Sequence, residues 1–170
     1  EVPSDKLVER QGIKYEINST TPFTGIEVLD FRSIEMGLYR TEYKNGKQEG
    51  LSEHYYQNGN LDSRSDDDFL EKYYENGQLE RRQNYKDGKL HGLQEGFYRN
   101  GQPYYRTNFK NGKSDGLYEL FHENGQLEER GKDKDGKKDG LWESYYENGQ
   151  LKETGNYKNG KTDGLFEEYY

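Results

Sequence analysis

Aromatic side chains recur at one position of this chain, and they are its best candidates for binding chemistry. Tyr118, Trp142 and Phe166 follow one another at intervals of 24 residues, and Tyr98 and Tyr146 stand at a second recurrent position. Ring faces contact apolar or sugar surfaces, and tyrosine hydroxyls form hydrogen bonds. A ladder of such rings on a sheet suits an extended peptide, a glycan or a partner strand. The alternative is that the rings pack only on one another and on lysine or arginine stems.

Patterns that support catalysis or metal binding are missing from the sequence. His54, His91 and His122 occupy different positions of different repeats, so no pair or triad recurs. The chain has no cysteine, which excludes thiolate nucleophiles and cysteine-type zinc sites. Its glycines stand in turns and form no phosphate-binding loop. We therefore predict no enzyme activity, no cofactor and no metal.

The recurrent positions arise because the chain repeats about every 24 residues from Gly50 onward. The units open at Gly50, Asp68, Gly92, Gly116, Gly140 and Gly164. Regular units carry two Asn-Gly or Asp-Gly dipeptides, which favour type I′ turns because both residues tolerate positive φ. These turns leave strands of 9 and 11 residues, and the glycine within the longer strand predicts a bulge or bend. The expected fold is all-β, an elongated single-layer antiparallel meander of stacked β-hairpin repeats with almost no helix.

Two apolar positions of each unit share a face of the predicted sheet. Leu117 and Phe121 represent them, since residues four apart on a strand point to the same side. We expect this pair of stripes to form the packed core. The opposite face would carry the ladder of Tyr118, Trp142 and Phe166, although a bulge at the glycine can exchange the two faces.

The ends and one internal segment depart from the repeat. We interpret residues 1–12 as a polar tail, residues 13–49 as a degenerate N-terminal capping unit and residues 50–170 as the repeat array, interrupted at 62–68. Residues 31–36 are expected to replace the first turn of the capping unit. Asp66, Asp67 and Asp68 supply oxygen ligands of the kind that calcium prefers, but a polar loop is the favoured interpretation. The chain stops at Tyr170 where another turn would follow, so either the last strand is an edge open to self-association or further residues are missing.

The charge pattern limits the classes of partner. The formal net charge is −8, from 33 acidic and 25 basic residues, and the two signs are interleaved. Nucleic acid is disfavoured because attraction to phosphate needs clustered lysine and arginine. Direct membrane contact is expected to be weak, and no apolar run approaches the roughly 18 residues of a membrane-spanning helix. Because the chain begins at Glu1 without methionine, we expect that an upstream segment such as an export signal was removed.

Two sequence signatures resemble the bacterial variant of the MORN repeat. They are the Tyr-Tyr-Glu-Asn-Gly-Gln-Leu of residues 73–79 and 145–151, and the Tyr-Lys-Asn-Gly-Lys-Thr-Asp-Gly-Leu of residues 157–165. The resemblance covers about residues 13–170 and departs from the family pattern at 25–36 and 62–68. It implies a β-hairpin repeat fold with roles in protein contacts or phospholipid association. Bacterial members are often labelled antitoxins, and some carry a phosphatidylinositol phosphate kinase label that this chain, without a recognisable kinase domain, does not justify.

Three functional hypotheses follow from the residues and the resemblance together. The leading one is a non-enzymatic scaffold that binds a protein partner or extended polymer through Tyr98, Tyr118, Trp142, Tyr146 and Phe166. The alternatives are an antitoxin-like inhibitor that covers a basic toxin, and an adaptor associated with membrane phospholipids. The expected location is the bacterial cell envelope or exterior, and the alternative is the cytoplasm.

Overall fold

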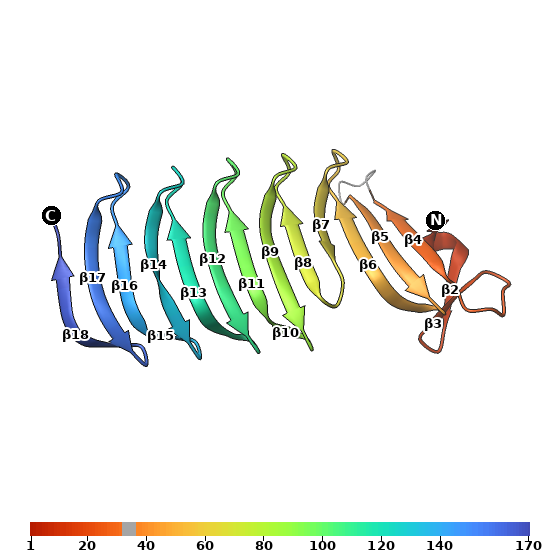
Figure 1. The fold of residues 1–170 in the computed structure, drawn as a ribbon. Coiled ribbons are helices and arrows are strands. Elements are labelled where there is room, and N and C mark those ends of the chain that lie inside the picture. The colour runs from red at the N-terminus through yellow and green to blue at the C-terminus, as the bar shows by residue number, and fades with distance from the viewer. Residues whose placement is uncertain (32–36) are drawn as a thin grey trace. The chain divides into compact units, whose positions relative to one another are not determined.

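The computed structural model describes residues 1–31 and 37–170. Among these residues the only helical element is a single 3-10 turn, Ser4–Lys6, and all other regular structure is β-strand. The chain divides into two compact units, Glu1–Gly77 and Gln78–Tyr170. The expected all-β meander of hairpin repeats is confirmed in both units, which are described separately below (Figure 1).

Unit 1 contains a sheet of six strands and a small separate hairpin. The strands of the sheet lie in the order β1 (Val2–Pro3), β4 (Gly25–Asp30), β5 (Leu38–Lys44), β6 (Lys47–Tyr55), β7 (Leu61–Ser65) and β8 (Phe69–Tyr73). The hairpin pairs β2 (Leu7–Arg10) with β3 (Ile13–Glu16). All neighbours in the sheet are antiparallel except β1, which runs parallel to β4.

The first residues of unit 1 have regular structure. Residues 1–12, interpreted above as a polar tail, supply β1, the 3-10 turn and β2. Beside them, the ammonium of Lys14 donates to the buried carboxylate of Glu27 at 2.5 Å and lies 4.9 Å from the ring centroid of Tyr43. Phe23 is buried next to this group. The expected replacement of a turn by residues 31–36 lies, apart from Phe31, outside the described residues.

The short repeat at residues 62–68 retains strand pairing. β7 and β8 pair directly, with Ser63 opposite Lys72 and Ser65 opposite Leu70. Oδ1 of Asp66 accepts hydrogen bonds from the backbone N–H groups of Asp68 and Phe69, at 2.7 and 3.0 Å, and so closes the turn. The hairpin is shorter here because the aspartate turn stands in place of a longer strand and its Asn-Gly pair.

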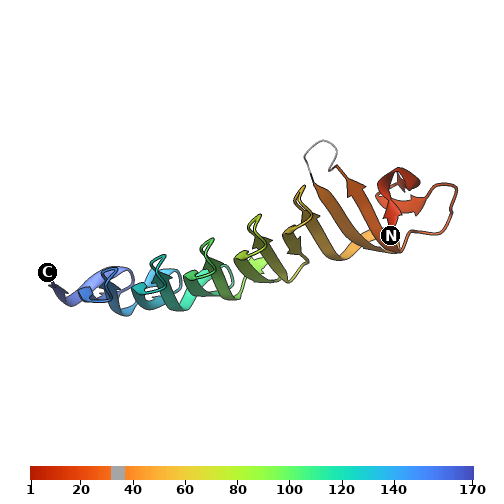
Figure 2. The ribbon, with the colours of Figure 1, turned by 90° about the horizontal axis from the view of Figure 1, so that it is seen from above.

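Unit 2 is a single row of strands joined by short turns. The order is β9 (Leu79–Lys86), β11 (Gly92–Phe97), β12 (Pro103–Lys110), β13 (Lys113–Phe121), β14 (Leu127–Lys134), β16 (Gly140–Tyr145), β17 (Leu151–Lys158) and β18 (Lys161–Glu168). β10 (Lys89–Leu90) pairs with β9, and β15 (Lys137–Lys138) pairs with β14. Viewed along the strands, the hairpins are curled and not flat (Figure 2).

The predicted bend at the glycine of the long strand is confirmed. Thr107 pairs with Tyr118 and Phe109 with Ser114, so three residues of β13 lie opposite Asn108 alone. Gly116, at the centre of the three, has φ of +126°. In two other repeats the same bend divides the long strand, which gives β10 with β11 and β15 with β16.

The Asn-Gly and Asp-Gly turns adopt two conformations, so the expectation of type I′ throughout is wrong for half of them. In the lower turns of Figure 1 both residues have positive φ, as in Asn111 (52°) and Gly112 (82°). In the upper turns only the glycine does. There the Gly101 N–H donates to the Tyr98 carbonyl at 2.9 Å, and Oδ1 of Asn100 accepts from the Gln102 N–H. The upper turn is therefore a tight turn followed by a glycine bulge.

The upper asparagines also join successive repeats. Nδ2 of Asn100 donates to the carbonyl of Glu123, and Nδ2 of Asn124 donates to that of Glu147, at 2.9 and 2.8 Å. The asparagine side chain thus satisfies backbone groups of its own turn and of the next repeat. The lower turns contain aspartate at two positions, which shows that they do not depend on this donor.

The predicted core of leucine with an aromatic residue is wrong for the leucines. Leu93, Leu117, Leu141 and Leu165 are 40%, 43%, 51% and 70% exposed. Gln94 and Trp142, each one position further along the strand, are 1% and 4% exposed. The bend at the glycine sets which side of the long strand is covered. The covered side carries the ladder position, and we call it the buried face.

Candidate binding surface

A line of paired residues crosses the buried face of unit 2. Its members are Gln94, Thr107, Tyr118, Gly131, Trp142, Gly155 and Phe166. Large side chains on β11, β13, β16 and β18 alternate with small ones on β12, β14 and β17. A Cβ atom at Gly131 would fall 2.2 Å from the Trp142 ring, and one at Gly155 would fall 2.7 Å from the Phe166 ring. The glycines therefore make room for the rings of the neighbouring strand.

Trp142 lies at the centre of this line and is enclosed by its neighbours. Its ring centroid is 5.3 Å from that of Tyr118 and 6.5 Å from that of Tyr157, with which it makes an edge contact. Nζ of Lys138 lies 3.9 Å from the centroid of the Trp142 ring, and the indole N–H donates to the Lys132 carbonyl at 3.1 Å. This packing on rings and a lysine stem was the alternative to ligand binding, and it occupies the faces of the indole.

Tyr118 and Phe166 flank Trp142 in the line and differ in exposure. Tyr118 is half-buried, and burial raises the pKa of its hydroxyl above the ordinary value. Phe166 covers Gly155 with one side of its ring and is 41% exposed. Among the three ladder aromatics, Phe166 thus presents the most ring surface to a ligand.

Tyr98 and Tyr146 lie at the start of the upper turns, and their side chains link successive repeats. The Tyr98 hydroxyl donates to the carbonyl of Phe121 at 2.8 Å, and the Tyr146 hydroxyl donates to that of Tyr169 at 2.9 Å. In the repeat between them, Nε2 of His122 lies 3.0 Å from the carbonyl of Tyr145. The side chains at this position therefore form hydrogen bonds to the backbone of the following repeat. Tyr146 remains 37% exposed.

A hollow of about 390 Å³ opens beside Tyr146. It is lined by side chains of β13, β14, β16 and β17 together with the upper turns, and these include Leu120, His122, Glu129, Ser144, Lys152 and Glu153. Within the described part of the chain, Oγ of Ser144 is buried and has no hydrogen-bond partner. Glu129 accepts a hydrogen bond from Lys138 at 2.5 Å. The hollow thus combines aromatic edges, carboxylates and a lysine ammonium around the buried Ser144 hydroxyl.

The opposite face carries a row of alternating arginine and glutamate, which the sequence analysis did not identify. In unit 2 the paired residues are Arg82, Glu95, Arg106, Glu119, Arg130, Glu143, Thr154 and Glu167. In unit 1 they are Arg40, Glu53, Arg64 and Glu71. We call this side the charged face.

Ion pairs between neighbouring strands stabilise the charged face. Nε of Arg130 donates to Glu143 at 2.6 Å, and this bond raises the pKa of the guanidinium. Nε of Arg106 donates to Glu95 at 3.2 Å. The sequence does show arginine at intervals of 24 residues, and it shows glutamate three residues after the first residue of each repeat. Only the strand register shows that the two series alternate along one line.

The histidines and carboxylates form no recognisable catalytic or metal site within residues 1–31 and 37–170. His54 bonds Asp62 at 2.7 Å in unit 1, while His122 lies in unit 2 against a backbone carbonyl. No group of three or more histidine, aspartate or glutamate side chains in the described chain is placed to hold a metal ion. A helix long and apolar enough to span a bilayer is likewise not found in the described residues.

Comparison with known protein families identifies the repeat. A model of the MORN repeat variant matches residues 48–65, 70–87, 90–111, 114–132 and 138–159. The matched segments fall in both units and cover more than half of the chain. No curated protein matches the sequence.

Proposed function

Because the chain belongs to the MORN repeat variant family, we propose that it is a non-enzymatic scaffold that binds a protein partner or extended polymer. The binding surface is the part of the buried face formed by β16, β17 and β18, next to the hollow described above. The observation that carries this proposal is the exposure of Tyr146 and Phe166, 37% and 41%, on either side of Ser144 and Glu153. Exposed aromatic rings next to carboxylates are suited to an extended ligand.

The five candidate residues have different roles in this proposal. Phe166 and Tyr146 contact the ligand with their exposed surfaces. Trp142 and Tyr118 support Phe166 from within the line of paired residues, and Tyr98 fixes the neighbouring repeat through its hydroxyl bond to Phe121. Substitution of Trp142 would therefore change the fold as well as the surface, and it is a poor first test.

The test uses two adjacent residues on opposite faces of β18. Phe166→Ser removes the exposed ring of the buried face. Leu165→Ser removes a side chain of the charged face that is 70% exposed. Immobilised protein is exposed to a bacterial cell extract and to a panel of polysaccharides. We expect Phe166→Ser to lose the ligand that the unmodified protein captures and Leu165→Ser to retain it. Equal capture by both variants would show that the surface is elsewhere.

An antitoxin-like inhibitor is a second candidate, favoured by carboxylates on the same face. Glu129 and Glu153 both pair with Ser144 across the sheet, and Glu168 pairs with Glu153. An acidic, aromatic surface suits the substrate site of a basic toxin. Co-expression with a toxic gene from the same locus tests this candidate: rescue of growth by the unmodified chain and failure of rescue by Phe166→Ser would support it. Such a role would favour a bacterial cytoplasmic location over an exported one.

A membrane phospholipid adaptor is the third candidate. With a net charge of −8, bulk electrostatics oppose binding to anionic lipid. Flotation with anionic and neutral vesicles tests it, and strong flotation with anionic vesicles alone would favour this candidate over the scaffold.

A further inference from the structure

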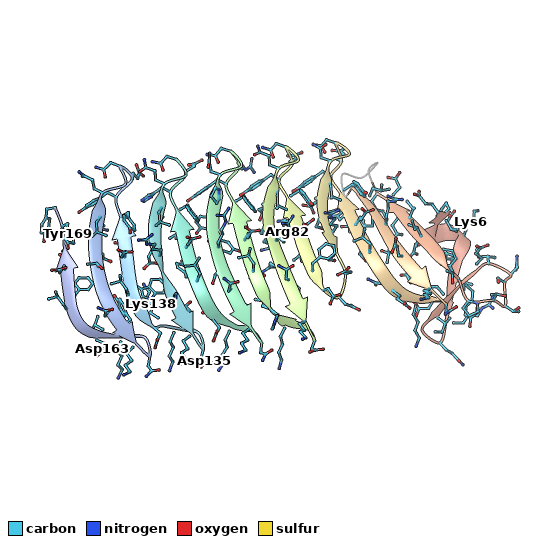
Figure 3. All side chains as sticks on the ribbon, in the orientation of Figure 1. Lys6, Arg82, Asp135, Lys138, Asp163 and Tyr169 are labelled. Atoms are coloured by element: carbon cyan, nitrogen blue, oxygen red, sulfur yellow. The ribbon has the colours of Figure 1, made fainter. Side chains whose placement is uncertain are left out.

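The turn asparagines of unit 2 differ in what their side chains bond. In the upper turns, the side chains of Asn100 and Asn124 use both ends. Their Oδ1 atoms accept from the backbone N–H two residues further on, and their Nδ2 atoms donate to the next repeat. In the lower turns, the side chains of Asn111 and Asn159 are exposed and make no hydrogen bond within the described part of the chain. The lower turns stand at the edge where Figure 3 labels Asp135.

Each of these asparagines precedes a glycine, whose backbone nitrogen can attack the side-chain amide. Glycine hinders such an attack least, because it has no side chain. The glycine N–H is hydrogen-bonded in both kinds of turn: that of Gly101 donates to the Tyr98 carbonyl at 2.9 Å, and that of Gly112 donates to the Leu90 carbonyl at 2.8 Å. The attacking nitrogen therefore does not distinguish the turns, and the difference lies in the asparagine side chain.

We propose that Asn111 and Asn159 are sites of spontaneous deamidation, and that Asn100 and Asn124 are protected from it. The backbone nitrogen of the following glycine forms a bond to Cγ of the asparagine. The bond from Cγ to Nδ2 breaks, and ammonia leaves with the proton that the glycine nitrogen gives up. Water then opens the cyclic imide at either carbonyl, which yields aspartate or isoaspartate. This modification lies away from the aromatic surface and does not depend on the function proposed for it.

The hydrogen bonds of the upper asparagines oppose ring closure. The side chain must rotate until Cγ meets the glycine nitrogen, and in Asn100 this rotation breaks the bonds of both Oδ1 and Nδ2. The equivalent rotation in Asn111 breaks no side-chain bond. Two hydrogen bonds that stabilise only the starting state slow the reaction by about fivefold or more.

The two products of deamidation differ in how they fit the lower turns. Aspartate fits, since Asp87 and Asp135 already occupy equivalent positions with φ of 51° and 52°, and the φ of Asn111 is 52°. Isoaspartate carries the chain through its former side chain, which adds a backbone atom before Gly112. The N–H that donates to the Leu90 carbonyl is then displaced, and the contact between successive turns is lost.

Asn45 in unit 1 stands in a lower turn but has a shielded glycine. Gly46 is buried, and a Cβ atom there would collide with the side chain of Ile13. The Gly46 N–H donates to the Phe23 carbonyl at 2.6 Å. We expect slow deamidation of Asn45, because its side chain is exposed but the attacking nitrogen is enclosed.

The test incubates the folded protein in mildly alkaline buffer and maps the product by mass spectrometry. Cleavage after glutamate releases residues 96–119, a single peptide that contains both Asn100 and Asn111. We expect Asn111 to convert at least about fivefold faster than Asn100. Incubation in concentrated urea is the control, because unfolding removes the hydrogen bonds and leaves both Asn-Gly pairs, so the two rates should become nearly equal.

Three results would refute the proposal. They are a ratio of the two rates that is the same in buffer and in urea, faster conversion of Asn100 in the folded protein, and conversion of Asn111 in urea alone.

A variant assigns the reaction to its residue. Asn111→Gln retains an amide, but its closure onto the glycine nitrogen needs a larger ring, which forms more slowly. Glutamine accepts the conformation of this turn, since Gln11 and Gly12 have φ of 53° and 75° in the hairpin of β2 and β3. We expect the variant to lose the conversion in residues 96–119, while Asn159 converts at its unmodified rate as an internal control. Conversion in this peptide that continues unchanged would place the reaction at another residue.

Discussion

The indole of Trp142 lies directly against Gly131 on the neighbouring strand, where a Cβ atom would fall 2.2 Å from ring carbon Cδ2. The φ of Gly131 is outside the left-handed region, so alanine meets no backbone strain there and only the collision opposes it.

Gly131→Ala should therefore destabilise unit 2 by about 1–3 kcal/mol through overpacking. Gly155→Ala is the matched substitution, since its Cβ would approach a ring that is 41% exposed and free to move. Urea unfolding of the two variants should show the larger loss for Gly131→Ala. Equal losses would mean that the indole can shift as easily as the phenyl ring.

Trp142 is the only tryptophan, so its fluorescence reports on the buried face. At 4% exposure the indole should emit at short wavelength and resist quenching by iodide. Lys138→Met removes the ammonium over the ring and should change the emission intensity while keeping the side-chain stem. Efficient iodide quenching of the folded protein would contradict the enclosed position.

The charged face offers a stabilising substitution at the position where the alternation of arginine and glutamate is interrupted. Thr154 lies between Glu143 and Glu167, at the place where earlier repeats have Arg106 or Arg130. Thr154→Arg should stabilise the protein by about 0.3–1 kcal/mol at low salt, and most of the gain should vanish at 1 M salt. Thr154→Gln, without the charge, is the control in thermal unfolding. A gain shared by both variants would assign the effect to packing.

The two kinds of turn should respond differently to the same substitution. Asn124→Asp removes the donor to the Glu147 carbonyl and places a carboxylate beside it, so a loss of about 1 kcal/mol is expected. Asn111→Asp reproduces the Asp-Gly already found at Asp87 and Asp135, and little change is expected. Denaturant unfolding separates the two, and similar losses would show that both turns depend on the asparagine amide.

The stability of unit 1 should fall in acid because of Glu27. Burial would raise the pKa of this carboxyl, but the hydrogen bond and charge of Lys14 outweigh it, and the pKa lies below the ordinary value. A lowered folded-state pKa gives stability that is present above the unfolded-state pKa and is lost as the pH falls below about 4.5.

Glu27→Gln should accordingly be less stable at pH 7 and should lose less on acidification. Glu49→Gln is the control, since Glu49 pairs with Lys44 at 3.2 Å with both side chains 61% exposed. Thermal unfolding from pH 7 to pH 3 measures the difference. Parallel pH profiles for the unmodified protein and Glu27→Gln would exclude Glu27 as the sensitive group.

The sequence by itself determined the strands, the turns and the repeat. Asn-Gly and Asp-Gly pairs favour tight turns wherever they stand, and the interval between them sets strand length, because these are properties of neighbouring residues. The glycine bend in β13 followed from the same local rule, since a glycine within a strand permits a conformation that other residues avoid.

Only the tertiary structure decided which residues meet. The bend at the glycine of each long strand determines which side of that strand is buried. Trp142 is therefore enclosed, while Leu141 beside it is half exposed. The register aligns residues of neighbouring strands, such as Arg106 with Glu119. It also places residues that are one repeat apart, such as Lys110 and Lys134, on the same edge. Charges that look evenly mixed along the chain are separated in space, because contact across strands depends on pairing and not on distance in the sequence.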